Sequence, residues 1–353
     1  MPRRPGPGPR RPTIADIAER AGVSKGSVSY ALNGNPGLSD RTRRRILAIA
    51  EEVGWRPNRA AQALSASRSG ACGLVIARPA RALAYEPFFS RLLSGIEAEL
   101  SERHLALMIQ IVEDVVAERE ALRRWWAERR VDGALLIDLR VDDPRTEAVE
   151  EMGMPAVIVG GPGHTGTLPF FPGNDGGGVR LMVDHLASLG HLHIDRVGGS
   201  PAFASTQVRT RAFKQALARV GAKGRTITTD YTSLGGANAT ARLLSKEPRP
   251  TAIIYDSDIM AVAGLSTAQE LGLSVPEELS LASFDDSILC EVVRPALTAC
   301  ARDVQAYGAT AARALVSVIE GEDVPLHGEQ SSVLVARAST AEAPGRVGAW
   351  GGQ

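Results

Sequence analysis

The feature that most constrains the fold is an alternation of short apolar runs with helix-like segments, which begins at Ala71. Apolar runs of 4–8 residues are typical of buried strands, whereas apolar residues spaced at i, i+3 and i+4 are typical of helices. A helix is expected from Phe88 to Arg103, and the strand candidates are CGLVIA (72–77), LALMIQI (105–111), GALLI (133–137), AVIV (156–159), AIIY (252–255) and LSLASF (279–284). Strands that alternate with helices predict an α/β architecture, a parallel sheet covered by helices.

A different pattern precedes Ala71 and predicts three short helices. The first helix begins near Thr13 and ends at Gly22, the second is capped by Ser24 and reaches about Leu32, and the third runs from Ser39 to Gly54. The first two helices meet across a short turn at 21–23, which is the spacing of a helix-turn-helix, whose second helix enters the major groove of DNA. The alternative is an ordinary helical hairpin in a protein core.

The charge distribution favours the DNA interpretation. Residues 1–68 contain 13 Lys and Arg against 5 Asp and Glu, a net charge of +8, whereas the rest of the chain carries −8 and the whole chain is neutral. Residues 1–68, called the head below, are basic and attract phosphate, whereas the acidic remainder of the chain does not.

Composition excludes several other classes of protein. The 353 residues, 44% hydrophobic and 23% charged, indicate a soluble protein of two or three compact units. Cys72, Cys290 and Cys300 have neither disulfide-framework nor zinc spacing. The basic start precedes no apolar leader segment, so we expect a cytoplasmic protein.

Two glycine-containing motifs that could suggest an enzyme do not fit one. The glycines of GNDGGG (173–178) lack a Walker lysine and predict a bend, and GVSKG (22–26) follows a helix rather than the strand that a nucleophile elbow requires. We therefore expect no cofactor, no metal and no enzymatic activity.

Several stretches of the sequence are similar to one known family. IADIAERAGVS, VSYALNG and RPNRAAQAL in the first 64 residues, and EPFFSRLLSGIE, HLASLGH, SDIMAVAG, LGLSVPEELSLASFDD and RAST further on, occur in the order expected of the lactose-repressor (LacI/GalR) family. The resemblance implies an N-terminal all-α helix-turn-helix domain plus a two-lobed α/β sensor of the periplasmic-binding-protein-like type I class. It implies one lobe of about 71–172 plus 301–331 and a second of about 173–300 plus the last strand, with three chain crossings between them.

The expected domain boundaries combine both lines of argument. They are a disordered basic tail (1–12), a helix-turn-helix domain (13–57), a hinge helix and linker (58–70), an effector-binding and dimerisation domain (71–341) and a flexible C-terminal tail (342–353).

The second helix and the hinge supply the expected DNA contacts. Lys25 can bond a guanine, whereas Gly26 has no side chain to read a base; Lys25 and Tyr30 could alternatively contact only the DNA backbone. The resemblance adds the hinge helix, in which Leu64 wedges into the minor groove of dimer-bound DNA, although Leu64 could instead be a core residue. The expected DNA-binding residues are Lys25, Gly26, Ser27, Ser29, Tyr30, Asn33, Asn58, Arg59 and Leu64.

The resemblance also assigns an effector cleft. Its residues are Phe88, Phe89, Ser205, Arg209, Ser257, Asp285 and Arg302. Arg209 and Asp285 follow strands, where open α/β sheets bind ligands, and together could hold adjacent hydroxyls; the alternative is a structural ion pair. Phe88 and Phe89 could equally be core residues.

These features predict the function. The leading hypothesis is a homodimeric repressor that binds pseudo-palindromic double-stranded operator DNA under allosteric control by a small molecule, with a sugar favoured by the resemblance and a purine or other metabolite as the alternative. A solute-binding protein and an enzyme on a nucleotide-binding sheet are disfavoured by the DNA-binding head and by the missing nucleotide motif.

Overall fold

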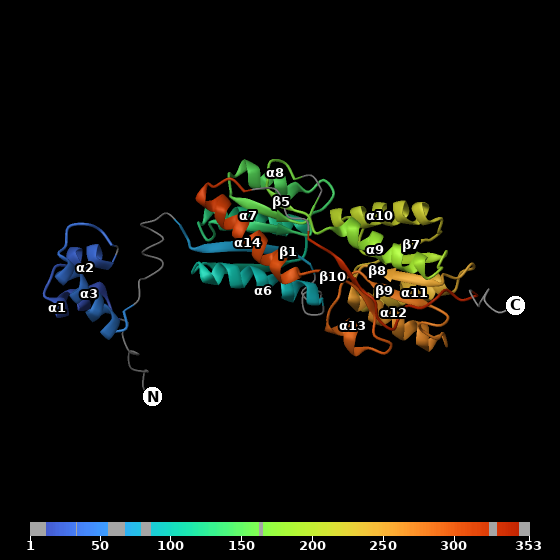
Figure 1. Ribbon diagram of the computed structural model, residues 1–353. Helices are drawn as coiled ribbons and strands as arrows, with labels where there is room; N and C mark the ends of the chain where they lie inside the picture. Colours follow the sequence, from blue (N-terminus) through green and yellow to red (C-terminus); the bar gives the residue numbers. More distant parts are fainter. Residues whose placement is uncertain are drawn as a thin grey trace, which may run out of the picture. The chain divides into compact units, whose positions relative to one another are not determined.

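The computed structural model describes residues 12–32, 34–55, 68–78, 86–161, 165–324 and 330–345. The chain divides into two compact units, Met1–Arg68 and Ser69–Gln353, and Figure 1 draws both. The predicted basic tail, apart from Pro12, and most of the predicted hinge lie outside the described residues, as does the C-terminal tail beyond 345.

The first unit contains three helices, α1 (Ile14–Ala21), α2 (Lys25–Leu32) and α3 (Asp40–Glu52). The Asp16 carboxylate accepts a hydrogen bond of 2.6 Å from the Thr13 N–H, and α1 ends at Gly22, which has a φ of 61°. A glycine adopts this left-handed conformation without the strain that a Cβ would add. The apolar stripes of the three helices form one small core that includes Ile17, Val28 and Ile46. The predicted helices are therefore confirmed within a residue or two.

The first lobe of the second unit is built on a five-stranded parallel sheet in the order β2-β1-β3-β4-β5. Its strands are β1 (Ala71–Ala77), β2 (Ala106–Val112), β3 (Gly133–Ile137), β4 (Ala156–Val159) and β5 (Phe170–Phe171). Helices α6 (Pro87–Glu102) and α14 (Val304–Glu320) cover one face, and α7 (Val115–Ala127) and α8 (Pro144–Glu151) cover the other (Figure 1).

The second lobe is built on a six-stranded sheet in the order β11-β10-β9-β8-β6-β7, in which only β11 is antiparallel. Its strands are β6 (Ile194–Gly198), β7 (Thr226–Thr228), β8 (Ala252–Tyr255), β9 (Ser280–Ser283), β10 (Thr298–Ala301) and β11 (Val333–Val335). Helices α9 (Asp175–Ser188) and α10 (Ala204–Val220) pack on one face, and α11 (Ser233–Leu244), α12 (Asp258–Glu270) and α13 (Ile288–Val292) pack on the other.

Two glycines allow α6 and α14 to touch backbone to backbone. A Cβ on Gly95 would lie 1.9 Å from the carbonyl oxygen of Gln305, and one on Gly308 would lie 2.3 Å from the carbonyl oxygen of Leu92. Real Cβ atoms do not approach so closely, so any larger residue would push the helices apart.

The chain crosses between the lobes three times, as expected. The crossings run from β5 to α9, from β10 to α14, and from α14 to β11. The predicted bend at 173–178 is partly wrong, because Gly176, Gly177 and Gly178 belong to the first turn of α9. A Cβ on Gly178 would lie 2.8 Å from the Phe284 ring, so this glycine serves close packing. Among the described helices, none is long and apolar enough to cross a membrane.

Candidate functional site

The second helix of the first unit presents the side chains that were predicted to read DNA. Lys25, Gly26 and Tyr30 are exposed, Tyr30 with half of its surface accessible, whereas Ser27 and Ser29 are half-buried. The Ser24 hydroxyl accepts a hydrogen bond of 3.1 Å from the Ser27 N–H and so caps α2 as predicted. This arrangement leaves the start of α2 open to a partner; the predicted contacts at Asn33, Asn58, Arg59 and Leu64 lie outside the described residues.

Arg43 on α3 was not predicted to matter, yet it holds the segment that follows α2. Its guanidinium donates hydrogen bonds to the carbonyl oxygens of Asn35, at 2.5 Å, and Ala31, at 3.4 Å. The run of arginines at 41–45 signalled a basic surface, but the sequence could not show which of them bends inward.

A pocket of about 80 Å³ lies between the two lobes of the second unit, at the carboxyl ends of their strands. Open α/β sheets bind ligands at this edge because the loops there leave a crevice. Six of the seven predicted effector residues line it: Phe88, Phe89, Ser205, Arg209, Asp285 and Arg302.

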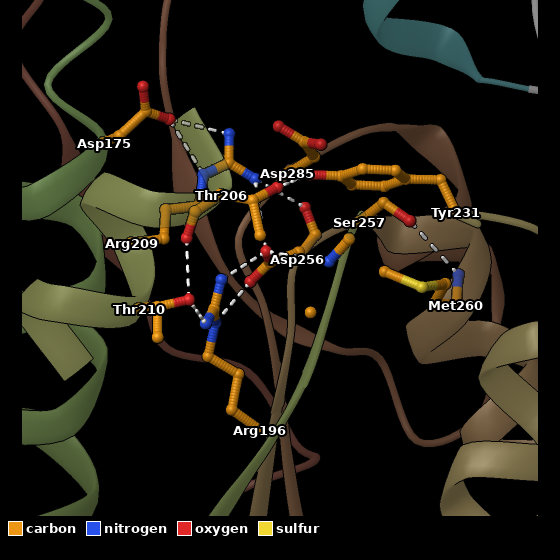
Figure 2. Close-up of polar contacts among 12 residues, drawn as sticks. Asp175, Arg196, Thr206, Arg209, Thr210, Tyr231, Asp256, Ser257, Met260 and Asp285 are labelled. Atoms are coloured by element: carbon orange, nitrogen blue, oxygen red, sulfur yellow. Dashed lines mark hydrogen bonds and ion pairs between the residues drawn. The ribbon is translucent and has the colours of Figure 1, made fainter. Parts of the chain in front are cut away.

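Ser257 does not line this pocket. Its hydroxyl accepts a hydrogen bond of 3.4 Å from the Met260 N–H and caps α12, and the residue is 3% exposed (Figure 2). A serine directly before a helix is a common cap.

Arg209 belongs to a buried charged network. Its Nε donates to Asp175 at 2.8 Å, and its Nη1 donates to the carbonyl oxygen of Asp256 at 3.1 Å (Figure 2). The Asp256 carboxylate in turn accepts two hydrogen bonds from the fully buried Arg196, at 2.7 and 2.5 Å. Burial lowers the pKa of the Arg209 guanidinium, but the surrounding negative groups, Asp175 first among them, together outweigh burial and hold this pKa above its usual range. Arg209 is therefore held rigidly by partners other than Asp285.

Asp285 pairs with Arg302 instead. Arg302 Nη2 donates to Asp285 Oδ1, and the Arg302 guanidinium carbon lies 4.4 Å from the centre of the Phe284 ring. Arg209 contacts the same ring at 3.6 Å. The buried Nε of Arg302 has no hydrogen-bond partner among the described residues. A buried donor without an acceptor is costly, so this N–H is available to a ligand or a water molecule.

The sequence reasoning missed several polar residues of the pocket. They are Arg78, Glu86, Asp138, Asp175, Tyr231 and Tyr307. Arg78 follows β1 and Asp138 follows β3, so the rule that led to Asp285 could have found both. Tyr307 lies on α14, and no local pattern shows that this helix returns to the first lobe.

Glu86 differs from the other charged groups of the pocket. Burial raises its pKa from 4.5 to about 8, while the nearby Arg78 guanidinium only partly opposes the rise. Each arginine of the pocket has an aspartate partner, in the pairs Arg78–Asp138, Arg209–Asp175 and Arg302–Asp285. With Glu86 protonated, the charges of the lining cancel.

A metal site has no support in the described parts of the chain, which hold no group of three or more His, Cys, Asp and Glu suited to an ion. The four aspartates that could have suggested one are Asp256, Asp258, Asp285 and Asp286. Three of them pair with arginines: Asp256 with Arg196, Asp285 with Arg302 and Asp286 with Arg337.

Both units match known families. Residues 13–58 match the model of bacterial regulatory proteins of the lacI family, and residues 183–340 match the periplasmic binding protein-like domain. The regulator CelR of Thermobifida fusca is 31% identical over 89% of this chain and 93% of its own length. The regulator MalR of Streptomyces coelicolor is 32% identical over 95% of this chain and 98% of its own length.

Solved structures show the same architecture. A complex of the regulator CelR with cellobiose has a TM-score of 0.72 at 29% identity and covers 93% of this chain and 100% of its own. The lac repressor dimer bound to operator and the anti-inducer ONPF has a TM-score of 0.82 at 25% identity and covers 94% of this chain and 100% of its own. The three-helix unit, the two-lobed unit and these relatives agree: the chain belongs to the lacI family of bacterial transcription regulators, which bind DNA and are not enzymes.

Proposed function

We propose that the chain is an allosteric repressor whose operator binding is controlled by an uncharged, hydroxyl-rich effector, a sugar or a sugar derivative, held in the inter-lobe pocket. The observation that carries this proposal is the charge balance of the pocket. Its three arginines are each paired with an aspartate, and its fourth carboxyl group, Glu86, is protonated at neutral pH.

The balance argues for hydroxyl groups over charged ones. A phosphate or carboxylate would face Asp138 and Asp285, and a cation would face Arg78 and Arg302. A hydroxyl group both donates and accepts, so it can bond the unpaired Arg302 N–H and a neighbouring carboxylate oxygen at the same time. The cellobiose complex of the relative CelR is consistent with this chemistry.

We further propose that the protein acts as a cytoplasmic homodimer, as the sequence predicted. β2 is an edge strand, and its Ile109 and Ile111 are each 43% exposed on the same face. In the other lobe, Ile288 and Val292 of α13 are 63% and 58% exposed. Exposed apolar side chains on an edge strand indicate a covered surface in the assembled protein.

The test combines DNA selection with ligand titration on the full chain. Selection from a random duplex library should yield a pseudo-palindromic site, and titration with cellobiose, maltose, glucose 6-phosphate and guanine should then show which compound changes affinity for that site. The proposal predicts a response to an uncharged sugar. A response only to guanine would establish the purine alternative, and one only to the phosphorylated sugar would refute the charge argument.

A further inference from the structure

Arg78 occupies an unusual position in the pocket. It follows β1 in the first lobe, yet its guanidinium carbon lies 4.2 Å from the centre of the Phe203 ring and 5.1 Å from that of Tyr231, both in the second lobe. Phe89 of the first lobe lies at 5.9 Å. A cation within about 6 Å of an aromatic ring face is attracted to it, more strongly when water is excluded.

The first lobe holds Arg78 in place for this contact. Its Nε donates to Asp138 Oδ2 at 2.8 Å, and the residue is 8% exposed. Burial lowers the pKa of the Arg78 guanidinium, but the neighbouring negative groups, Asp138 first among them, together outweigh burial and hold this pKa above its usual range. The Arg78 guanidinium therefore stays charged, and it faces the two rings of the second lobe.

Contacts within the second lobe hold the Tyr231 and Phe203 rings in position. The Tyr231 hydroxyl shares a hydrogen bond of 3.1 Å with Thr206, and Phe203 precedes α10 directly. The backbone beside Phe203 also joins the lobes, since the Ala204 N–H donates to the Leu139 carbonyl at 2.8 Å.

We propose that Arg78 is a positioning residue that joins the two lobes across the pocket by stacking against Phe203 and Tyr231. This contact holds the lobes close together. It also covers ring faces on which a sugar could otherwise stack, so the effector meets the terminal N–H groups of Arg78 instead. This last consequence rests on the proposed function, whereas the contact itself does not.

The experiment measures the distance between two spin labels, one in each lobe, by double electron–electron resonance on the full-length protein without added effector. Glu147 on α8 and Lys214 on α10 are exposed and lie in different lobes, so E147C and K214C provide the two labelling sites. Cys72, Cys290 and Cys300 are fully buried and do not compete for the label. Labelled protomers are diluted with unlabelled ones so that only distances within one chain are read.

R78M and F203L should each broaden the distance distribution and shift it to longer values, because a desolvated contact of this kind changes a two-state population ratio about tenfold. R78K, which keeps the charge beside Asp138 but loses the flat guanidinium, should shift it less. R124M is the control: Arg124 is an exposed arginine of the same lobe whose side chain donates to Gln110 at 3.2 Å.

The double variant R78M/F203L should open the lobes by less than the sum of the two single variants, since both remove the Arg78–Phe203 contact. R78M also removes the contact with Tyr231, and F203L also removes a contact of 5.4 Å between the Arg140 guanidinium and the Phe203 ring. Wild-type distributions in R78M and F203L, or opening in only one of them, would overturn the proposal. Thermal melting of each variant verifies that it is folded. No effector or DNA is used, so failure here is distinguishable from failure of the proposed function.

Discussion

At the scale of single residues, the pocket is defined by which charged groups are paired with which. The sequence placed Asp285 just past β9 and Arg209 in the helix that follows β6, but could not show that each has its own partner, Asp175 for Arg209 and Arg302 for Asp285. Asp175 precedes Arg209 by 34 residues and lies on another helix. Such pairings depend on the tertiary fold, so residue type and spacing alone could not predict them.

Asp285 is the residue we expect to matter most for effector affinity. Asp285→Asn removes the charge but keeps an oxygen that can accept from Arg302, so the protein should remain folded and bind its operator. Hydrogen bonds to charged groups contribute about 1.5–3 kcal/mol, so effector affinity should fall roughly 10- to 100-fold. Calorimetry with the responsive sugar measures this, and Asp184→Asn, which alters an exposed pair with Arg219, is the control. Unchanged affinity in Asp285→Asn would show that this carboxylate is structural.

Glu86 should make the stability of the sensor depend on pH. Its pKa in the folded protein, about 8, lies above the ordinary value of 4.5, so the folded state binds the proton more tightly than the unfolded state does. The stability that this group contributes is therefore complete below about pH 4.5 and is lost as the pH rises through 8.

Glu86→Gln cannot ionise and should remove this part of the pH dependence. Its melting temperature should exceed that of the wild type at pH 8.5 and approach it at pH 5. Glu128→Gln, at an exposed position on the same lobe, should leave the pH profile unchanged. Parallel profiles for Glu86→Gln and the wild type would contradict the raised pKa.

At the scale of elements, the sequence predicted the long and buried segments well and the short ones poorly. The central strands β1, β3, β4, β8 and β9 were all recognised, because each is an apolar run buried on both faces. β5 and β7 have two and three residues and were missed, and so was β10, which has four. A strand this short carries no periodic pattern, and it becomes a strand only because a neighbour pairs with it.

The contact between α6 and α14 gives a prediction at this scale. Gly95→Ala gains about 1 kcal/mol of intrinsic helix propensity, yet the added methyl would collide with the Gln305 backbone. Overpacking typically costs about 1–3 kcal/mol, and here a backbone atom rather than a flexible side chain must move, so the sensor should be destabilised. Gly26→Ala on α2 meets only the Ser24 hydroxyl, at 3.6 Å, and should stabilise the head. Scanning calorimetry of both variants tests this difference in sign; stabilisation by Gly95→Ala would show that the helices are not in backbone contact.

At the scale of the whole molecule, the proposed homodimer would place two DNA-binding units on the operator. One good base contact discriminates by about 1–3 kcal/mol, whereas specific regulators need about 4–10 kcal/mol over non-specific DNA. With Gly26 contributing no side chain, a single recognition helix has few residues with which to read bases. A dimer doubles their number.

Charges placed on the exposed edge strand should therefore abolish specific DNA binding without changing the head. Ile109→Lys combined with Ile111→Lys should yield a folded monomer in sedimentation and a loss of operator affinity in a mobility-shift assay. Leu192→Lys, at a 60% exposed position in the other lobe, should remain a dimer. A double variant that still sediments as a dimer would place the interface elsewhere.

The glycine contact between α6 and α14 also has a consequence for the proposed allosteric function. α6 begins just before Phe88, and α14 begins just after Arg302, so the two helices start at the pocket from opposite ends of the sequence. Since their backbones touch, neither can slide or tilt without the other. Under the proposed function, an effector that displaces the start of one helix would therefore move both helices as one rigid body.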